Sequence, residues 1–199
     1  GEPVLMHTLR VFHSYESDMA LILVLHSSFH TYWKELCKKH KFTIGHTLAT
    51  GGKNRYESVK NGLEQVDPDA LVAIHDGVRP LVSKQAISRC FEMTEKEGNA
   101  IPVWPVAESI REIIPDGKNK PADRTRFKLV QTPQVFKSTL IKKAYKGQYR
   151  QHFTDDAMVL ESLGYSINLV EGNAENIKIT TEQDLYMVKK LFEKKKTIT

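Results

Sequence analysis

The sequence is poor in cysteine. Cys37 and Cys90 are isolated and lack metal-ligand spacing, so we expect reduced thiols in a cytoplasmic protein, not a disulfide framework. Long apolar runs are missing too: none approaches the roughly 18 residues that a membrane span requires, and no cleavable signal sequence is visible. These absences favour a globular protein that has no membrane partner.

Signatures of nucleic-acid binding are equally scarce. The formal net charge is +5, but part of the excess comes from lysines near the C-terminus, in the pattern of a solvated helix face. There is no zinc-finger spacing, no helix-turn-helix pattern and no aromatic stacking motif. We therefore do not expect nucleic acid as a partner.

A glycine-rich loop of the Walker or dinucleotide-binding type is also lacking. Parallel α/β folds normally open with a buried strand whose following turn cradles phosphate, whereas this chain opens with a helical pattern after Pro3. Either a phosphate site is built differently, or an opening strand and loop are absent from the sequence as given. We expect residues 1–199 to form a single domain whose natural form is longer.

Helical and extended patterns alternate along the rest of the chain. Such alternation predicts an α/β fold, Rossmann-like, in which helices cover both faces of a mostly parallel twisted sheet. Thr154 is the expected N-cap of its helix, with Asp155 and Asp156 in the first turn. The predicted helices are 4–15, 28–40, 54–65, 83–97, 137–146, 154–163 and 181–193. The predicted strands are 20–25, 42–48, 71–74, 100–103, 109–114, 128–131 and 166–170.

The most informative stretch is the apolar strand 71–74 followed by a charged loop closed by Pro80. Ligands of open α/β sheets bind where such strands end. Asp76 can hold hydroxyls or a metal and Arg79 can hold phosphate, which suits a phosphorylated sugar-like ligand. The alternative is an ordinary turn with a surface ion pair. We expect His75 to be a packed histidine with no acid–base role.

Several segments, in order and spread over nearly the whole chain, carry a resemblance to a known family. They are Gly1-Glu2-Pro3-Val4-Leu5, Gly51-Gly52-Lys53-Asn54-Arg55, His75-Asp76-Gly77-Val78-Arg79-Pro80, Gln131-Thr132-Pro133-Gln134, Thr154-Asp155-Asp156-Ala157 and Val170-Glu171-Gly172-Asn173-Ala174-Glu175-Asn176-Ile177-Lys178. The sequence resembles the 2-C-methyl-D-erythritol 4-phosphate cytidylyltransferases. Ribitol-5-phosphate cytidylyltransferases share most of these segments, but Arg55 looks more like the methylerythritol enzymes.

The resemblance implies nucleotidyl transfer from CTP to 2-C-methyl-D-erythritol 4-phosphate in non-mevalonate isoprenoid biosynthesis. It also implies Mg²⁺ bound mainly through the CTP phosphates, with no metal site built from protein residues. In this family a glycine-rich loop after the first strand binds the nucleotide, and that region would precede Gly1. Two alternatives stay open: ribitol-5-phosphate as substrate, or a non-catalytic domain that binds sugar phosphates.

Residue by residue, the resemblance implies three groups. Catalytic residues are Arg124, Lys178 and Asp76; substrate-binding residues are Arg79, Ser109 and Thr132; nucleotide-binding residues are Gly51, Gly52, Ser58 and Asp76. Three of these residues also have a plainer interpretation: Ser58 as a surface serine at a helix start, Arg124 as an exposed loop arginine and Lys178 as a solvated lysine at a strand end. Residues 109–124, here called the arm, are expected to project from the domain and to exchange with a second copy in a homodimer.

Overall fold

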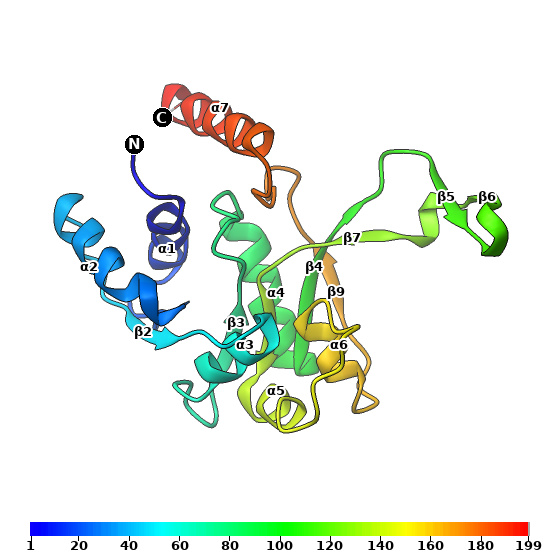
Figure 1. Cartoon of the computed structure of the whole chain (residues 1–199), viewed down its shortest axis with the longest axis horizontal. Helices are drawn as coiled ribbons and strands as arrows, with labels where there is room; N and C mark the ends of the chain where they lie inside the picture. Colours follow the sequence, from blue (N-terminus) through cyan, green and yellow to red (C-terminus); the bar gives the residue numbers. More distant parts are fainter. Residues whose placement is uncertain (199) are drawn as a thin grey trace.

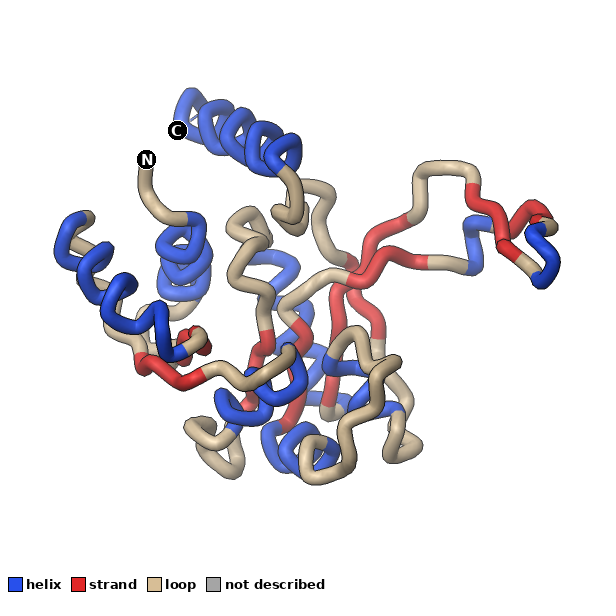
Figure 2. Tube along the Cα trace, in the orientation of Figure 1, coloured by secondary structure: helices blue, strands red, loops and turns tan. Residues whose placement is uncertain are grey.

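The structure, a computed structural model, describes residues 1–198, with side chains through Lys194. Helices surround a central sheet, and the hairpin of the arm projects from one side (Figures 1 and 2). The helices are α1 (Val4–Tyr15), α2 (His30–Lys39), α3 (Arg55–Leu63), α4 (Lys84–Glu97), α5 (Ser138–Ala144), α6 (Asp156–Glu161) and α7 (Glu182–Ile198), with 3-10 turns η1 (Ser27–Phe29), η2 (Pro115–Gly117) and η3 (Arg124–Arg126). The strands are β1 (Ile22–Leu25), β2 (Thr47–Thr50), β3 (Leu71–Ile74), β4 (Asn99–Pro105), β5 (Ile110–Ile113), β6 (Asn119–Ala122), β7 (Lys128–Val130), β8 (Gln134–Lys137) and β9 (Leu169–Glu171). No helix in this described part is long and apolar enough to cross a bilayer.

Helices with clear end signals begin and end as predicted. Ser83 caps α4, its hydroxyl accepting the Ala86 N–H at 3.1 Å. Gly98 ends that helix with φ of 89°, a left-handed conformation that glycine adopts without steric cost. The bounds of α1 and β3 are those expected from their apolar patterns.

Three local predictions need correction. Asp155, not Thr154, caps α6, because its carboxylate accepts the Met158 N–H at 3.0 Å. The strand expected at 42–48 lies instead at Thr47–Thr50, since Phe42 is buried in the core against Trp33. Strand β8 was not predicted, because it passes into α5 without an intervening turn.

The predicted α/β class is confirmed, but the sheet has more antiparallel pairing than expected. Strand β4 leads into the arm, and the returning chain pairs antiparallel with β4 first as β7 and then as β8. A chain that returns without a crossover helix must pair in this direction. Strand β8 also pairs antiparallel with β3, while β4–β9 and β1–β2 are parallel pairs.

The sheet is divided into two pieces. Strands β1 and β2 form one, and β3 begins the other, so each of β1 and β3 has a strand neighbour on one edge within residues 1–198. Helix α1 spans both pieces: Met6 and Leu9 pack with Leu23, and Phe12 packs with Ile87 of α4. A larger core lies under α3, α5 and α6.

Candidate active site

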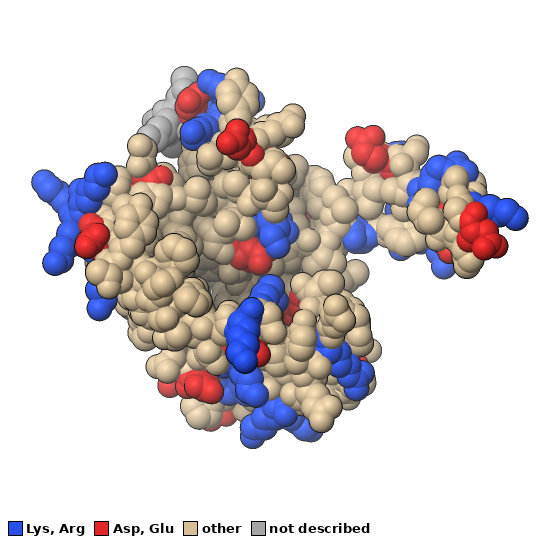
Figure 3. All heavy atoms as spheres, in the orientation of Figure 1, with Lys and Arg blue, Asp and Glu red and all other residues tan. Residues whose placement is uncertain are grey.

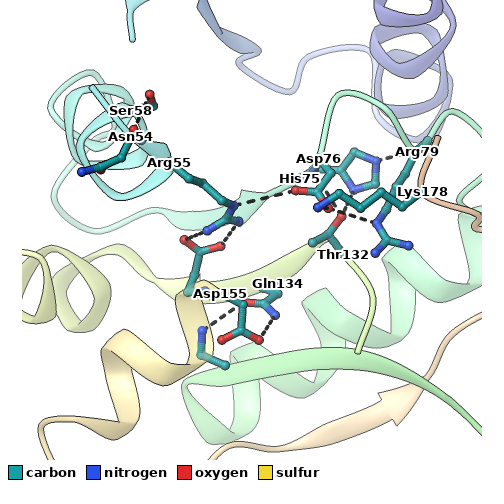
Figure 4. A network of polar contacts seen from close by, with 12 residues as sticks. Asn54, Arg55, Ser58, His75, Asp76, Arg79, Thr132, Gln134, Asp155 and Lys178 are labelled. Carbon is teal, nitrogen blue, oxygen red and sulfur yellow. Dashed lines mark hydrogen bonds and ion pairs between the residues drawn. The ribbon is translucent and has the colours of Figure 1, made fainter. Parts of the chain in front are cut away.

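The loop after β3 carries the most highly charged cluster of the candidate site. The Asp76 carboxylate lies 3.1 Å from Arg79 Nε, 3.3 Å from Lys178 Nζ and 3.8 Å from Arg55 Nε. These cations come from the same loop, from the segment after β9 and from the first turn of α3 (Figure 4). The structure therefore brings together segments that lie about a hundred residues apart in the sequence.

Electrostatics keep Asp76 ionised. Burial acts against the charged carboxylate, but the Arg79 hydrogen bond and the charges of Lys178 and Arg55 outweigh it and lower the pKa of Asp76. Arg79 is itself only 12% exposed in its side chain, and its Nη1 donates to the Asn176 carbonyl at 2.8 Å. Arg79 is thus committed to protein contacts, whereas the Lys178 side chain is 46% exposed and can meet a ligand.

Thr132 lies beneath the same loop. Its Oγ1 accepts the Asp76 backbone N–H at 3.1 Å and lies 3.0 Å from His75 Nδ1. The other ring nitrogen of His75, Nε2, is 3.0 Å from the Arg79 carbonyl. Since a carbonyl can only accept, Nε2 carries the proton and Thr132 donates to Nδ1. His75 is therefore a packed histidine, as predicted.

A second group of predicted residues forms the turn between β2 and α3. Gly51 N–H donates to the Leu25 carbonyl at 2.8 Å, which ties this turn to the end of β1. Ser58 Oγ accepts the Gly52 N–H at 3.0 Å and donates to the Asn54 carbonyl at 2.8 Å. A Cβ atom at position 52 would collide with Glu57, so glycine is required there. Because the Ser58 hydroxyl donates its only proton to Asn54, it can only accept a hydrogen bond from a ligand.

Arg55, which is not among the predicted site residues, links the two groups. Its guanidinium makes a bidentate pair with Asp156, with Nη1–Oδ1 at 3.0 Å and Nη2–Oδ2 at 2.6 Å. Asp156 is fully buried and also accepts from Tyr145 Oη at 2.6 Å. One signal was available: a cation in the first turn of a helix opposes the helix dipole, so a carboxylate partner elsewhere was to be expected.

The remaining predicted residues are not brought to this cluster. Ser109 and Arg124 lie on the arm, away from the sheet (Figure 1), where Arg124 Nη1 donates to the Ala107 carbonyl. Asp155 caps α6 and also accepts from Gln134 Nε2 at 2.9 Å. Within the part of the chain that the structure describes, no three His, Cys, Asp or Glu side chains group as metal ligands.

The arrangement suits an anionic ligand. Figure 3 shows a hollow in one face of the molecule, with acidic and basic side chains at its rim. The carboxylates of Asp76 and Asp156 face the three cations Arg55, Arg79 and Lys178, which leaves a net positive charge that attracts phosphate groups. No side chain here is poised as a nucleophile.

Comparison with known proteins agrees with this chemistry. The profile of the family described as "IspD: 2-C-methyl-D-erythritol 4-phosphate cytidylyltransferase" matches residues 1–194. The 2-C-methyl-D-erythritol 4-phosphate cytidylyltransferase of Bacteroides thetaiotaomicron is 48% identical over 185 residues, covering 93% of this chain and 84% of that protein.

Solved structures give the same result. The crystal structure of 4-diphosphocytidyl-2C-methyl-D-erythritol synthase from Anaerococcus prevotii matches with a TM-score of 0.85 at 26% identity, covering 97% of this chain and 87% of that chain. The 2-C-methyl-D-erythritol 4-phosphate cytidylyltransferase from Thermus thermophilus matches with a TM-score of 0.80 at 31% identity, covering 96% of this chain and 89% of that chain.

Proposed function

The chain belongs to the 2-C-methyl-D-erythritol 4-phosphate cytidylyltransferase family of nucleotidyltransferases, and from this membership we propose that it joins CTP to 2-C-methyl-D-erythritol 4-phosphate. The products are 4-diphosphocytidyl-2-C-methyl-D-erythritol and pyrophosphate, in non-mevalonate isoprenoid biosynthesis. The observation that carries the proposal is the meeting of Asp76, Thr132 and Lys178 beside the glycine turn of residues 51–58.

The reaction needs positioning and charge. A phosphate oxygen of the alcohol phosphate attacks the α-phosphorus of CTP, a new P–O bond forms, and the bond to the leaving pyrophosphate breaks. Because the attacking oxygen is already anionic, no general base is required. We assign Lys178, whose ammonium is half-exposed, to orient the attacking phosphate. Asp76 holds Lys178 in place and presents its carboxylate to substrate hydroxyls.

The nucleotide lies against the turn of Gly51, Gly52 and Ser58 in this proposal. Gly52 makes room for Glu57, whose carboxylate accepts the Lys53 N–H at 2.9 Å and shapes this turn. The lone pair left on Ser58 Oγ can accept from an amino group, and cytosine carries one.

We further propose that Mg²⁺ accompanies CTP. Asp76 is a single carboxylate surrounded by cations, which fits a metal ligated mainly by phosphate oxygens and water. When bound, the ion neutralises the triphosphate charge. Within this chain, Asp76 is the residue that would contact it.

In our proposal a homodimer with exchanged arms completes the site, since the arm that carries Ser109 and Arg124 projects away from the central sheet (Figure 1). Large apolar side chains on and beside the arm support this, because a lone domain rarely exposes so many together. They are Ile113 (75% exposed), Phe127 (48%), Leu129 (54%) and Val130 (43%).

We also propose that a strand outside residues 1–198 lies between β1 and β3 and leads into the loop that binds the triphosphate. Both strands are wholly apolar, as central strands are, yet seven of their eight residues are only half-buried. Unpaired apolar strand edges are strongly disfavoured in native proteins.

We propose a cytoplasmic location for the protein. The free thiols of Cys37 and Cys90 support it.

The test measures pyrophosphate release by the full gene product with CTP and Mg²⁺, offering 2-C-methyl-D-erythritol 4-phosphate or ribitol 5-phosphate in parallel. We expect turnover with the former to exceed that with the latter by at least about tenfold in kcat/KM. Equal or faster turnover of ribitol 5-phosphate would overturn the substrate assignment. No release with either would overturn the activity.

A further inference from the structure

Asn176 touches two of the residues that hold Asp76 in place. It is 1% exposed and lies after β9, two residues before Lys178. Its side-chain Nδ2 donates to the Thr132 carbonyl at 2.8 Å. Its own carbonyl accepts from Arg79 Nη1 at 2.8 Å.

Both of these contacts lead directly to Asp76. Arg79 Nε is hydrogen-bonded to the Asp76 carboxylate at 3.1 Å, and Thr132 Oγ1 accepts the Asp76 N–H at 3.1 Å. Asn176 thus holds the backbone of Thr132 through its side chain and the guanidinium of Arg79 through its main-chain carbonyl, and these two residues define where Asp76 lies. Asn176 acts on Asp76 only through Arg79 and Thr132.

One polar atom of the Asn176 side chain is buried without a hydrogen-bond partner. Asn176 Oδ1 is the one buried side-chain polar atom among the described residues that has no hydrogen-bond partner. A flipped amide would not repair this, because Nδ2 already faces two acceptors, the Thr132 carbonyl and Gln131 Oε1 at 3.3 Å. A buried acceptor left unpaired costs about 1–3 kcal/mol. The amide is therefore kept for what its Nδ2 holds, the Thr132 carbonyl and Gln131 Oε1, despite the cost of its unpaired oxygen.

We propose that Asn176 is a positioning residue for the cytidylyl transfer: it holds Arg79 and Thr132 so that the Asp76 carboxylate stays directed at Lys178. The inference rests on the proposed function and assigns Asn176 no contact with substrate. Misplacement of a charged group by about 1 Å can cost roughly a hundredfold in rate, so such a residue affects kcat more than substrate binding.

Asn173 offers a matched control on the same loop. Its Oδ1 accepts the Ser83 N–H at 3.0 Å and its Nδ2 donates to the Leu81 carbonyl at 3.1 Å. The side chain is thus as well connected as that of Asn176 but does not contact Thr132. Replacing either asparagine by alanine disturbs the same loop, and only Asn176→Ala removes a hydrogen bond to Thr132; the backbone carbonyl that accepts from Arg79 is kept in both variants.

The kinetic experiment compares Asn176→Ala and Asn173→Ala in the full gene product, at a temperature where both are folded. We expect Asn176→Ala to lower kcat roughly 10- to 100-fold and to change the KM values for CTP and alcohol phosphate less than about threefold. Asn173→Ala should keep kcat within about threefold of the parent. Equal losses of kcat in the two variants would reduce Asn176 to an ordinary loop residue.

A second readout does not depend on activity. Hydrogen exchange of the Asp76 amide should quicken at least about tenfold in Asn176→Ala, because the backbone of Thr132, whose hydroxyl accepts this N–H, loses the hydrogen bond from Asn176 to its carbonyl. The rate should stay unchanged in Asn173→Ala. If alanine at 176 prevents folding, Asn176→Ser and the downstream Thr132→Val replace it in the same two assays.

The two proposals fail in different ways. A parent protein that is inactive with CTP and 2-C-methyl-D-erythritol 4-phosphate contradicts the function, and the exchange experiment then still tests the link from Asn176 to Asp76. An active parent whose Asn176→Ala variant keeps both kcat and slow Asp76 exchange contradicts the positioning role alone.

Discussion

His75 shows how a single residue makes the site depend on pH. The ring is buried against Phe12, with ring centroids 4.9 Å apart, and its two nitrogens are satisfied by Thr132 and Arg79. Burial lowers the pKa of His75 from 6.5 to about 4, against the smaller opposing effect of its hydrogen bonds. The folded protein therefore requires the neutral imidazole.

The sign of the pH effect follows from linkage. Between pH 6.5 and about 4 the unfolded chain binds a proton at His75 that the folded chain does not, so the free energy of unfolding falls as pH falls. We expect a loss of about 2 kcal/mol between pH 7 and pH 5 from this group. Urea unfolding at each pH measures it.

The control for this prediction is His75→Gln, which keeps polar atoms near Thr132 and Arg79 but does not titrate. A lower stability of this variant at pH 7 has no bearing on the result, because the slope with pH is the quantity tested. Asp76, whose pKa lies below 3.8, titrates below this range. An unchanged slope in His75→Gln would show that other groups cause the acid sensitivity.

Among secondary-structure elements, the Arg55–Asp156 pair joins α3, which carries the glycine turn, to α6. Asp156 is fully buried, and burial is the largest cause of the raised pKa of its partner Tyr145, reinforced by the Asp156 charge. Removing one partner of a buried ion pair leaves an uncompensated charge. We expect Asp156→Asn to lower the free energy of unfolding by about 1.5–3 kcal/mol, because the Arg55 side chain is partly exposed and stays near Asp76.

Asp69→Asn is the matched control, since Asp69 is exposed and the same substitution there should stay within about 0.5 kcal/mol. A double variant, Arg55→Leu with Asp156→Leu, should be less destabilised than Asp156→Asn, because no charge is left unpaired. Equal stability of Asp156→Asn and Asp69→Asn in urea unfolding would mean that the pair does not hold the two helices together.

The same elements show what sequence can and cannot predict. Helix α4 was predictable because Ser83 and Gly98 mark its ends, and β3 because four apolar residues lie between turns. The direction of β7 and β8 was not, since it depends on the arm returning alongside β4. At the site, Asp76 stood out in its loop, whereas the partners of Asn176 lie 44 to 97 residues away in sequence and leave no local pattern.

At the scale of the whole molecule, the position of the arm decides how many copies make one site. Arg124 lies on a segment that projects from the domain (Figure 1), while Lys178 lies beside Asp76 at the partly exposed end of the sheet. If the arms exchange, each site takes Lys178 from one subunit and Arg124 from the other. If they do not, both residues must come from the same subunit.

Mixing two inactive variants separates these arrangements. We expect Arg124→Ala and Lys178→Ala to lose at least about 90% of activity each as homodimers, since each removes a charge from every site. A heterodimer with exchanged arms has one site lacking both side chains and one site with both intact. In an equal mixture about half of the dimers are mixed, and each of these has one intact site out of two. Co-refolded mixtures should therefore regain about a quarter of the parent rate.

The control mixes Lys178→Ala with Arg126→Ala, whose arginine lies on the same turn η3. Arg126→Ala should be active alone, so this mixture should keep about half of the parent rate, which shows that an inactive Lys178→Ala subunit does not silence the sites of its partner. Recovery is measured as pyrophosphate release at saturating CTP, and native mass spectrometry of each mixture measures the fraction of mixed dimers. A mixture of Arg124→Ala and Lys178→Ala that contains mixed dimers but stays inactive would place Arg124 and Lys178 in the same subunit and leave the projecting arm without a role in its partner's site.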